Sequence, residues 1–330
     1  MAATVLLPVG AARATTTVTF PDFSMTTGLT LSADAATATT TDGAVLRLTP
    51  AKESKSGSAF GTELIGVQQF TSVFSFRMTN PGGITDCNGR MGADGFTFTV
   101  QPVSRSIGSN GGGLGIEAVN PAVSVEFDTF CNDMIDPSSS HVGVDINGSV
   151  YSVATANVTP FMNDGNRWYA WVEYNGAKLT VRVSQTPDRP ATALLVYAID
   201  IKGTLGTENA YVGFTASTGG GYQNHDILQW TYNDHFDAPD GGDETGVGGG
   251  GGTGNGGAGG AGGTTVDSGA AGGQGGGADA GVDAGTVPGK GSSGCGCDTG
   301  GGQSYALGSV VVLLAAIAGR RRRSRRISTQ

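Results

Sequence analysis

The segment 123–147 concentrates side chains that bind cations in proteins. Glu126 and Asp128 alternate with apolar residues, and this period of two predicts a strand that carries both carboxylates on one face. Phe130 and Asn132 continue the same face.

The segment then returns as a second predicted strand. Asp136-Pro137 breaks the first strand, and His141 begins another alternating run that ends at Ile146. Two strands joined by a short loop would gather five polar side chains at one end: Glu126, Asp128, Asn132, Asp136 and His141.

This set of donor atoms suits two kinds of metal ion. Carboxylate and amide oxygens favour calcium, and an imidazole added to carboxylates favours manganese or a similar transition ion. Asp128 and Asp136 could bridge a pair of such ions. The alternative is a solvated acidic loop in which His141 is an ordinary strand residue.

The order of these residues resembles the metal-binding segment of the legume-type (L-type) lectins. The resemblance rests on Glu126-Phe-Asp128-Thr-Phe130, Asn132, Asp136-Pro137 and His141-Val-Gly-Val-Asp145. It implies that Glu126, Asp128, Asp136 and His141 hold the transition ion. It also implies that Asp128, Phe130 through its carbonyl, Asn132 and Asp136 hold calcium.

Three further loops resemble the sugar-binding loops of that family, in the same order. Ala93-Asp94-Gly95 matches a motif in which the aspartate follows a cis peptide and accepts hydrogen bonds from sugar hydroxyls. In Gly111–Gly115 we expect the backbone N–H of Gly112, or alternatively Gly113, to face the sugar. Ser217–Asp226 resembles the variable loop that sets sugar preference, with Gly220, Gly221 and Tyr222 as its candidate contacts.

The resemblance assigns Asn132 and Phe130 a second role each. Asn132 would donate its NH₂ to a sugar hydroxyl, and Phe130 would offer its ring to the apolar face of a pyranose. A mono- or oligosaccharide is therefore the expected ligand.

The elements that position these residues are short strands. Runs rich in Thr, Val and Phe recur between turn residues, and no segment before Asp237 shows a sustained helical period. This pattern predicts an all-β sandwich, in its lectin version a concanavalin-like jelly roll. Trp168, Trp171 and Trp230 are expected in its core.

Composition divides the chain into four parts. The sandwich is expected over 15–237, and a disordered glycine-rich linker over 238–294. Segment 1–14 ends in Ala-Arg-Ala like a secretory signal, although no basic residues precede its apolar stretch. The net charge of −9 argues against nucleic acid as a partner.

Segment 295–330 combines cysteines, a short apolar run expected to be helical, and an arginine cluster. This combination resembles the C-terminal sorting signal of myxobacterial surface proteins, which implies a bacterial chain, a sorting protease as partner, and tethering at the cell surface or outer membrane. The alternative is a transmembrane anchor, although a bilayer span needs about 20 apolar residues.

Cys87 and Cys131 flank the proposed sugar site and are a plausible disulfide in an exported protein; two free thiols are the alternative. A homodimer through the flat sheets is also allowed, as family members pair in several ways.

Two other functions remain open. One is a structural or adhesive surface protein with a degenerate sugar site. The other is a β-glucan hydrolase, whose family carries Glu-x-Asp-x-x-Glu on one strand. Here the third position is Cys131, which cannot act as the carboxylic acid, so we expect no catalysis.

Overall fold

The computed structural model describes residues 16–109, 111–132 and 135–236. The predicted signal (1–14), the linker (238–294) and the C-terminal segment (295–330) lie outside the described residues. Within the described part, no helix is long and apolar enough to cross a bilayer.

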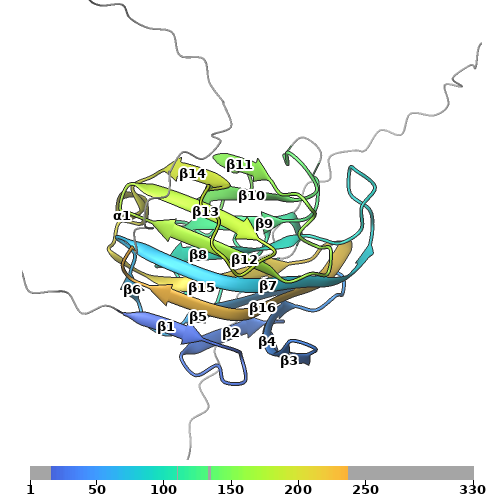
Figure 1. The fold of residues 1–330 in the computed structure, drawn as a ribbon, viewed down its shortest axis with the longest axis horizontal. Coiled ribbons are helices and arrows are strands. Elements are labelled where there is room, and N and C mark those ends of the chain that lie inside the picture. Colours follow the sequence, from blue (N-terminus) through green and yellow to red (C-terminus); the bar gives the residue numbers. More distant parts are fainter. Residues whose placement is uncertain (1–15, 110, 133–134, 237–330) are drawn as a thin grey trace, which may run out of the picture. The chain divides into compact units, whose positions relative to one another are not determined.

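Two antiparallel sheets, each of eight strands, form the domain (Figure 1). The first sheet has the order β14-β13-β12-β7-β16-β4-β3, with β1 paired to β16. Its strands are β1 (Thr17–Phe20), β3 (Ala36–Thr40), β4 (Gly43–Thr49), β7 (Phe70–Gly83), β12 (Trp168–Tyr174), β13 (Lys178–Ser184), β14 (Leu195–Ala198) and β16 (Gly221–Asn233).

The second sheet has the order β11-β10-β9-β8-β15-β5-β2, with β6 paired to β15. Its strands are β2 (Leu29–Ala33), β5 (Ser56–Gly61), β6 (Ile65–Gly66), β8 (Gly95–Gln101), β9 (Val123–Asp128), β10 (His141–Ile146), β11 (Ala154–Asn157) and β15 (Asn209–Ser217). The fold is the predicted all-β jelly-roll sandwich.

Aromatic side chains from both sheets meet in the core. Phe74 of the first sheet packs edge-on against Phe214 of the second, with 5.1 Å between ring centroids, and Phe96 stacks on Phe127 at 4.8 Å. Burial of such rings removes large apolar areas from water and holds the two layers together.

The three tryptophans are buried as expected, but they do not all lie on the same face of their sheet. Trp171 is buried, but it does not belong to the core cluster that contains Trp168 and Trp230. Core residues Ala170 and Val172 flank it in β12, and strand alternation therefore turns Trp171 to the opposite face of the sheet.

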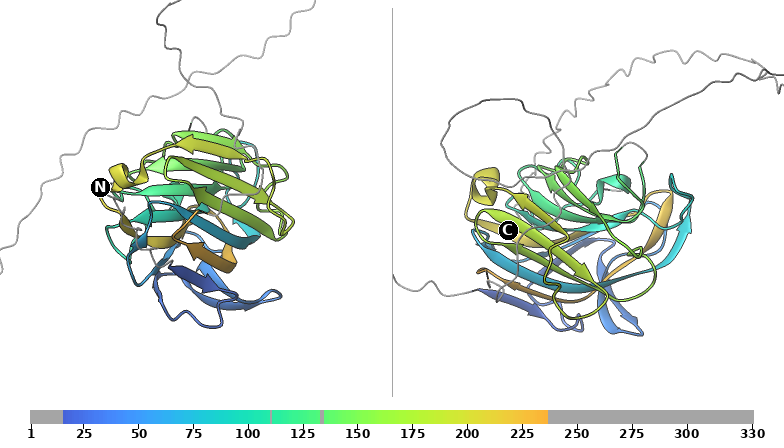
Figure 2. Two further views of the ribbon diagram at one scale, coloured as in Figure 1. Left: turned by 60° about the vertical axis from the view of Figure 1, so that its left-hand side comes forward. Right: turned by 45° about the horizontal axis from the view of Figure 1, so that its top comes forward.

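Two short helical elements interrupt the strands. Helix α1 (Ile201–Leu205) is capped at its N-terminus by Asp200, whose Oδ1 accepts a hydrogen bond from Gly203 N at 2.8 Å. It is visible as a single coil at one edge of the sandwich in both views of Figure 2. The 3₁₀ turn η1 spans Gly111–Gly113. Both elements are too short to show a sustained helical period in the sequence.

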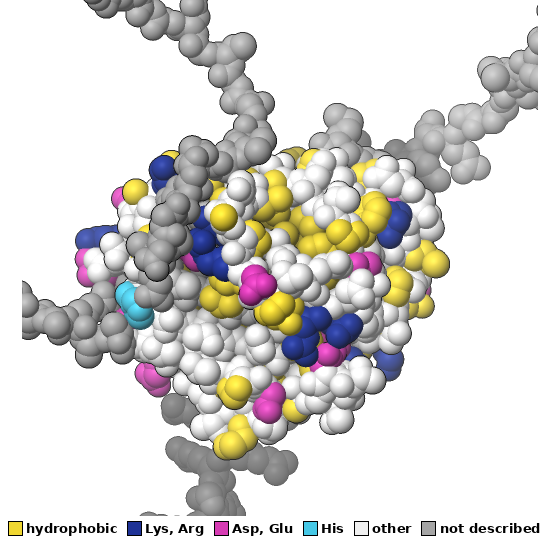
Figure 3. Space-filling model, viewed as in Figure 1, with side chains coloured by type: hydrophobic (Ala, Val, Ile, Leu, Met, Phe, Trp, Pro, Cys, Tyr) yellow, Lys and Arg dark blue, Asp and Glu magenta, His cyan; other side chains and the backbone are white. Residues whose placement is uncertain are grey.

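Charged side chains on the face shown in Figure 3 are interspersed among polar and hydrophobic ones. Several basic groups of the domain are paired with acids: Arg47 with Asp226 at 2.7 Å, and both Arg77 and Arg167 with Asp42, at 2.7 and 3.1 Å.

Candidate metal and ligand site

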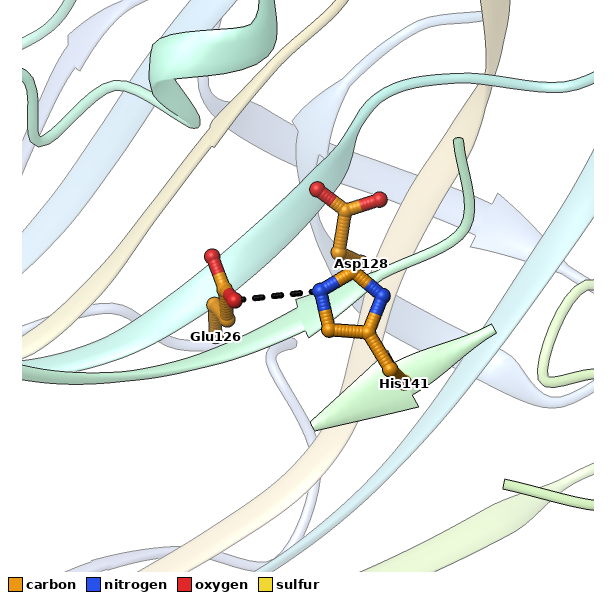
Figure 4. A group of neighbouring side chains, drawn as sticks. All are labelled: Glu126, Asp128 and His141. Atoms are coloured by element: carbon orange, nitrogen blue, oxygen red, sulfur yellow. Dashed lines mark hydrogen bonds and ion pairs between the residues drawn. The ribbon is translucent and has the colours of Figure 1, made fainter. Parts of the chain in front are cut away.

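The register between β9 and β10 brings the predicted metal ligands together. Asp128 lies opposite His141, and Glu126 lies opposite Gly143. A Cβ on Gly143 would overlap Glu126 Oε1 and Ser152 Oγ, so glycine leaves the room that the Glu126 side chain occupies. Figure 4 shows Glu126 and Asp128 on one strand and His141 on its neighbour.

Three of the ligand groups form a compact buried cluster. One oxygen each from Glu126 and Asp128 and one ring nitrogen of His141 lie within 4.8 Å of one another. His141 Nε2 is 3.2 Å from Glu126 Oε1, and 3.9 Å from Asp136 Oδ1. Carboxylates and an imidazole at this spacing are a suitable donor set for a transition ion.

His141 is oriented for metal binding by its other ring nitrogen. Nδ1 lies 3.1 Å from the carbonyl oxygen of Ser138, which can only accept a hydrogen bond. Nδ1 therefore carries a proton, and Nε2 faces the carboxylates; release of the proton from Nε2 would free the lone pair that a metal ion needs.

The electrostatics of the metal-free cluster are unfavourable for charged carboxylates. Burial, followed by the negative charges of Glu126 and Asp136, raises the pKa of Asp128 well above its usual range. Burial alone would lower the pKa of His141, but the hydrogen bond and charge of Glu126 outweigh it and raise this pKa. A bound cation would remove the repulsion among these groups.

Two cavities flank these carboxylates. A cavity of about 290 Å³ is lined by Glu126, Asp136 and His141, and another of about 240 Å³ by Glu126, Asp128, Asn132 and Asp136. The first offers the imidazole and the second the amide. Glu126 and Asp136 line both cavities, so these two carboxylates could reach an ion in either one.

Between β9 and β10, side-chain carboxylates accept the backbone hydrogen bonds that strand pairing would otherwise take. Strand β9 ends at Asp128, earlier than the alternation predicted. Phe130 N donates to Asp128 Oδ1 at 2.7 Å, and Asn132 N donates to Asp136 Oδ2 at 2.7 Å. Phe130 and Asn132 therefore belong to a loop folded around Asp128 and Asp136.

Asp94 lies next to this loop. The Ala93–Asp94 peptide bond is cis, as the resemblance implied, and Thr129 N and Oγ1 both donate to the carbonyl oxygen of Asp94, at 2.9 and 3.1 Å. Asp94 is 4% exposed, and its Oδ2 has no hydrogen-bond partner among the described residues. Burial, followed by the charge of Asp136, raises the pKa of Asp94 to about 7, although the backbone N–H of Gly219 acts in the opposite direction.

A buried hydrogen-bond chain continues from Thr129 into the core. Gln223 Nε2 donates to Thr129 Oγ1 at 2.6 Å and lies 3.1 Å from His225 Nε2. His225 Nδ1 in turn lies 2.6 Å from Thr49 Oγ1. Complete burial lowers the pKa of His225 to about 3, which keeps the ring neutral, with its proton on Nδ1 and an acceptor at Nε2.

The glycine-rich turns meet the same site. A Cβ on Gly112 would lie 3.4 Å from Asn132 Nδ2, whereas one on Gly113 would collide with the Glu117 side chain. Gly112 is therefore the glycine that faces Asn132. Gly219 was not singled out in the sequence, yet its Cβ would lie 3.5 Å from Asp94 Oδ2.

The predicted ten-residue variable loop is much shorter in the structure. Strand β15 extends to Ser217 and β16 begins at Gly221, so only 218–220 lie outside strands. The extension arises because β7 continues to Gly83, which pairs with Gly221.

The structure separates two members of the predicted sugar set. A Cβ on Gly221 would contact Ala93 and Phe130, whereas the ring of Tyr222 lies against Gly82. Successive strand residues point to opposite faces, so Tyr222 is turned away from the face on which Gly221 meets Ala93 and Phe130.

Asp145 and Ser152 extend the cluster of Glu126, Asp128 and His141 and were not predicted as site residues. Ser152 Oγ lies 2.5 Å from Glu126 Oε1 and 2.7 Å from Asp145 Oδ1. Alternation places Asp145 on the face of His141, a signal that could have found it. No local pattern points to Ser152.

Cys87 and Cys131 form the predicted disulfide, which joins the loop before Asp94 to the chain between β9 and β10. Cys131 occupies the position where a β-glucan hydrolase would need its third carboxylate. A disulfide sulfur has no proton to transfer, so the acid/base role has no candidate at this position.

Comparison with known proteins gives a consistent result. The family model of the legume lectin domain matches residues 15–246. A curated L-type lectin-domain containing receptor kinase (VIII.1) of Arabidopsis thaliana is 33% identical over 207 residues, which is 59% of this chain and 27% of that protein. Agglutinin-2 of Cladrastis kentukea is 37% identical over 183 residues, 51% of this chain and 58% of that protein.

Solved structures of lectins also match. The winged bean acidic lectin complexed with methyl-α-D-galactose gives a TM-score of 0.56 with 25% identity, over 67% of this chain and 98% of that one. Peanut lectin with a nine-residue peptide gives 0.56 with 27% identity, over 67% and 97%. The matched proteins are lectins or carry a lectin domain, so the shared domain is non-catalytic.

Proposed function

Because the chain belongs to the legume lectin domain family, we propose that it binds carbohydrate at Asp94 and that metal ions at the adjacent carboxylates organise this site. The relatives named above are plant proteins, so a bacterial origin stays a prediction. The chain spans about a quarter of the receptor kinase and 58% of the agglutinin, and their complete activities are not transferred.

The observation that supports the proposal most directly is the buried carboxylate of Asp94. Its Oδ2 is buried without a hydrogen-bond partner among the described residues. It lies beside Gly219, which has no side chain. A buried unpaired acceptor is unfavourable, and a ligand hydroxyl would satisfy it. Asn132 and the N–H of Gly112 would add donors, and Phe130, Gly220 and Gly221 would complete the rim.

The metal part of the proposal uses the residues already described. Glu126, Asp128, Asp136 and His141 would hold a transition ion such as manganese. Asp128, the Phe130 carbonyl, Asn132 and Asp136 would hold calcium. These ions supply positive charge that offsets the repulsion among the buried carboxylates. The carboxylates of Asp128 and Asp136 also hold the backbone of Phe130 and Asn132, and so the position of Asn132 beside Gly112.

We also propose that the domain is exported and tethered at the cell surface or outer membrane. This rests on the signal-like segment 1–14, the glycine-rich segment 238–294 and the cysteine- and arginine-containing segment 295–330. Pairing into a homodimer through the flat sheets, and processing by a sorting protease, remain part of the same proposal.

A glycan array measured with calcium and manganese, and again after EDTA, tests the function. We expect glycan binding that EDTA removes, and that Asp94→Ala abolishes while the protein still unfolds in one cooperative transition. Asp188→Ala is the matched control, because Asp188 is exposed on the loop after β13. Binding by the Asp94→Ala protein at wild-type level would refute the assignment of the site. No binding to any glycan would favour an adhesive protein with a degenerate site.

A further inference from the structure

Glu117 is a carboxylate that belongs to neither implied set of metal ligands, yet it lines the cavity of about 240 Å³. Three of the four residues implied for calcium, Asp128, Asn132 and Asp136, line the same cavity. Glu117 is exposed and lies in the turn that follows η1. The wall of this cavity therefore holds one more carboxylate than the resemblance assigns to the metal ions.

The backbone that carries Glu117 is fixed on both sides. The preceding residue, Ile116, is 2% exposed. Glu117 N donates to the carbonyl oxygen of Gly113 at 3.1 Å, and Ala118 N donates to the carbonyl oxygen of Gly148 at 3.0 Å. Because this backbone is already ordered, little conformational entropy is lost when the side chain binds a ligand.

The Glu117 side chain folds back over its own turn. A Cβ on Gly113 would lie 2.6 Å from Glu117 Cβ and 2.8 Å from Glu117 Oε2, so the carboxylate lies against Gly113. The neighbouring Gly112 faces Asn132. The carboxylate of Glu117 and the amide of Asn132 therefore border the same short turn. The ion pairs among the described residues involve other carboxylates, so none of them holds Glu117 away from the cavity.

The buried carboxylate of Asp128 independently indicates a cation in this cavity. Asp128 is 2% exposed, and its Oδ1 accepts the hydrogen bond from Phe130 N. Its Oδ2 accepts no hydrogen bond from the described residues. Calcium binds about six to eight oxygen atoms, and the four implied residues supply one oxygen each if every carboxylate binds through a single atom. Positions on the ion therefore stay open for further oxygen donors.

We propose that Glu117 is a further calcium ligand, which binds the ion through its carboxylate at a position that the implied set leaves open. The inference rests on the metal part of the proposed function and adds a residue to it. A charged oxygen donor suits calcium, and the number of charged ligands tunes the affinity of a calcium site. Glu117 would therefore lower the calcium concentration at which the sugar site becomes organised.

Calorimetric titration of the full-length, manganese-loaded protein with calcium tests the ligand. We expect Glu117→Ala to bind calcium about tenfold more weakly than wild type. The residue is exposed, so the variant should fold, and its melting curve in EDTA checks this. Glu63→Ala is the matched control, because Glu63 is an exposed acid before β6, which pairs with the end of β15 remote from Ser217. It should bind calcium as wild type does.

Terbium luminescence separates direct binding of the ion from a more distant effect of charge. Terbium replaces calcium at oxygen sites, and its decay rates in H₂O and D₂O count the water molecules bound to it. Water should take the place of the missing carboxylate, so terbium should hold about one more water molecule in Glu117→Ala than in wild type or Glu63→Ala.

Two results would overturn the ligand and leave the proposed function intact. One is a calcium affinity that does not change in Glu117→Ala, and the other is weaker binding without an added water molecule. Failure of wild type to bind either calcium or terbium would overturn both this ligand and the metal part of the proposed function.

Discussion

Replacement of Asp94 by asparagine in the metal-free protein should reveal how unfavourable the charged carboxylate is. The pKa of Asp94 is raised from 3.8 to about 7, chiefly by burial. The folded protein therefore binds this proton more tightly than the unfolded chain does. The free energy of unfolding should fall as the pH rises from about 4 to 7, and the loss should persist at higher pH.

The size of the effect follows from the shift. At about 1.4 kcal/mol for each pKa unit, ionisation of Asp94 lowers the free energy of unfolding by at most about 4 kcal/mol above pH 7. Between pH 5 and pH 8 the loss is about 3 kcal/mol of that total. Asparagine has nearly the same shape and no charge, so Asp94→Asn should escape this loss.

Urea denaturation in EDTA at pH 5 and pH 8, with wild type and Asp94→Asn in parallel, measures the difference. We expect the variant to gain about 3 kcal/mol relative to wild type between the two pH values. Asp188→Asn, at an exposed position, should follow wild type. A difference between Asp94→Asn and wild type that does not change with pH would refute the assignment of a raised pKa to this carboxylate. The same variant should lose glycan binding, because the amide replaces an acceptor oxygen with a donor.

Three further perturbations have defined outcomes. Calcium and manganese at about 100 times their dissociation constants should raise the free energy of unfolding by about 2.7 kcal/mol per site, and an unchanged melting curve after EDTA treatment would contradict an occupied site. Thr129→Val should weaken glycan binding about tenfold with calcium affinity unchanged, because it removes the hydroxyl that donates to the Asp94 carbonyl and accepts a hydrogen bond from Gln223. Thr129→Ser should retain binding. Thr99→Val, which removes another buried hydroxyl, should leave binding unchanged. The double variant Cys87→Ser/Cys131→Ser should lower the free energy of unfolding by up to about 4 kcal/mol, as expected for opening a loop of sequence separation 44; chemical denaturation without reductant measures it, and no loss would contradict a formed disulfide.

The buried carboxylates predict that metal affinity and the stability of the metal-free domain change in opposite directions with pH. Burial and neighbouring negative charge raise the pKa of Asp128 and of Asp145 in the metal-free protein. Metal ions compete with protons for these groups, so metal affinity should increase with pH while the metal-free domain loses stability.

Much of the fold and of the metal site could be predicted from local sequence. Alternation placed Glu126 and Asp128 on one face of a strand because covalent geometry sends successive side chains to opposite sides. The same rule predicted most strands of the sandwich, and the order of the motifs indicated the family. Helix α1 was not predicted, because five residues are too few to show a helical period.

Only the tertiary structure decided the contacts between segments that are distant in the sequence. The hydrogen bonds from Thr129 to Asp94 and from Gln223 to Thr129, the position of Gly219 beside Asp94, and the face of the sheet on which Trp171 lies all depend on strand register and on how the sheets stack. Local sequence determines which side chains share a strand face. Register and packing are settled by the free energy of the whole domain, and they decide which of those faces meet.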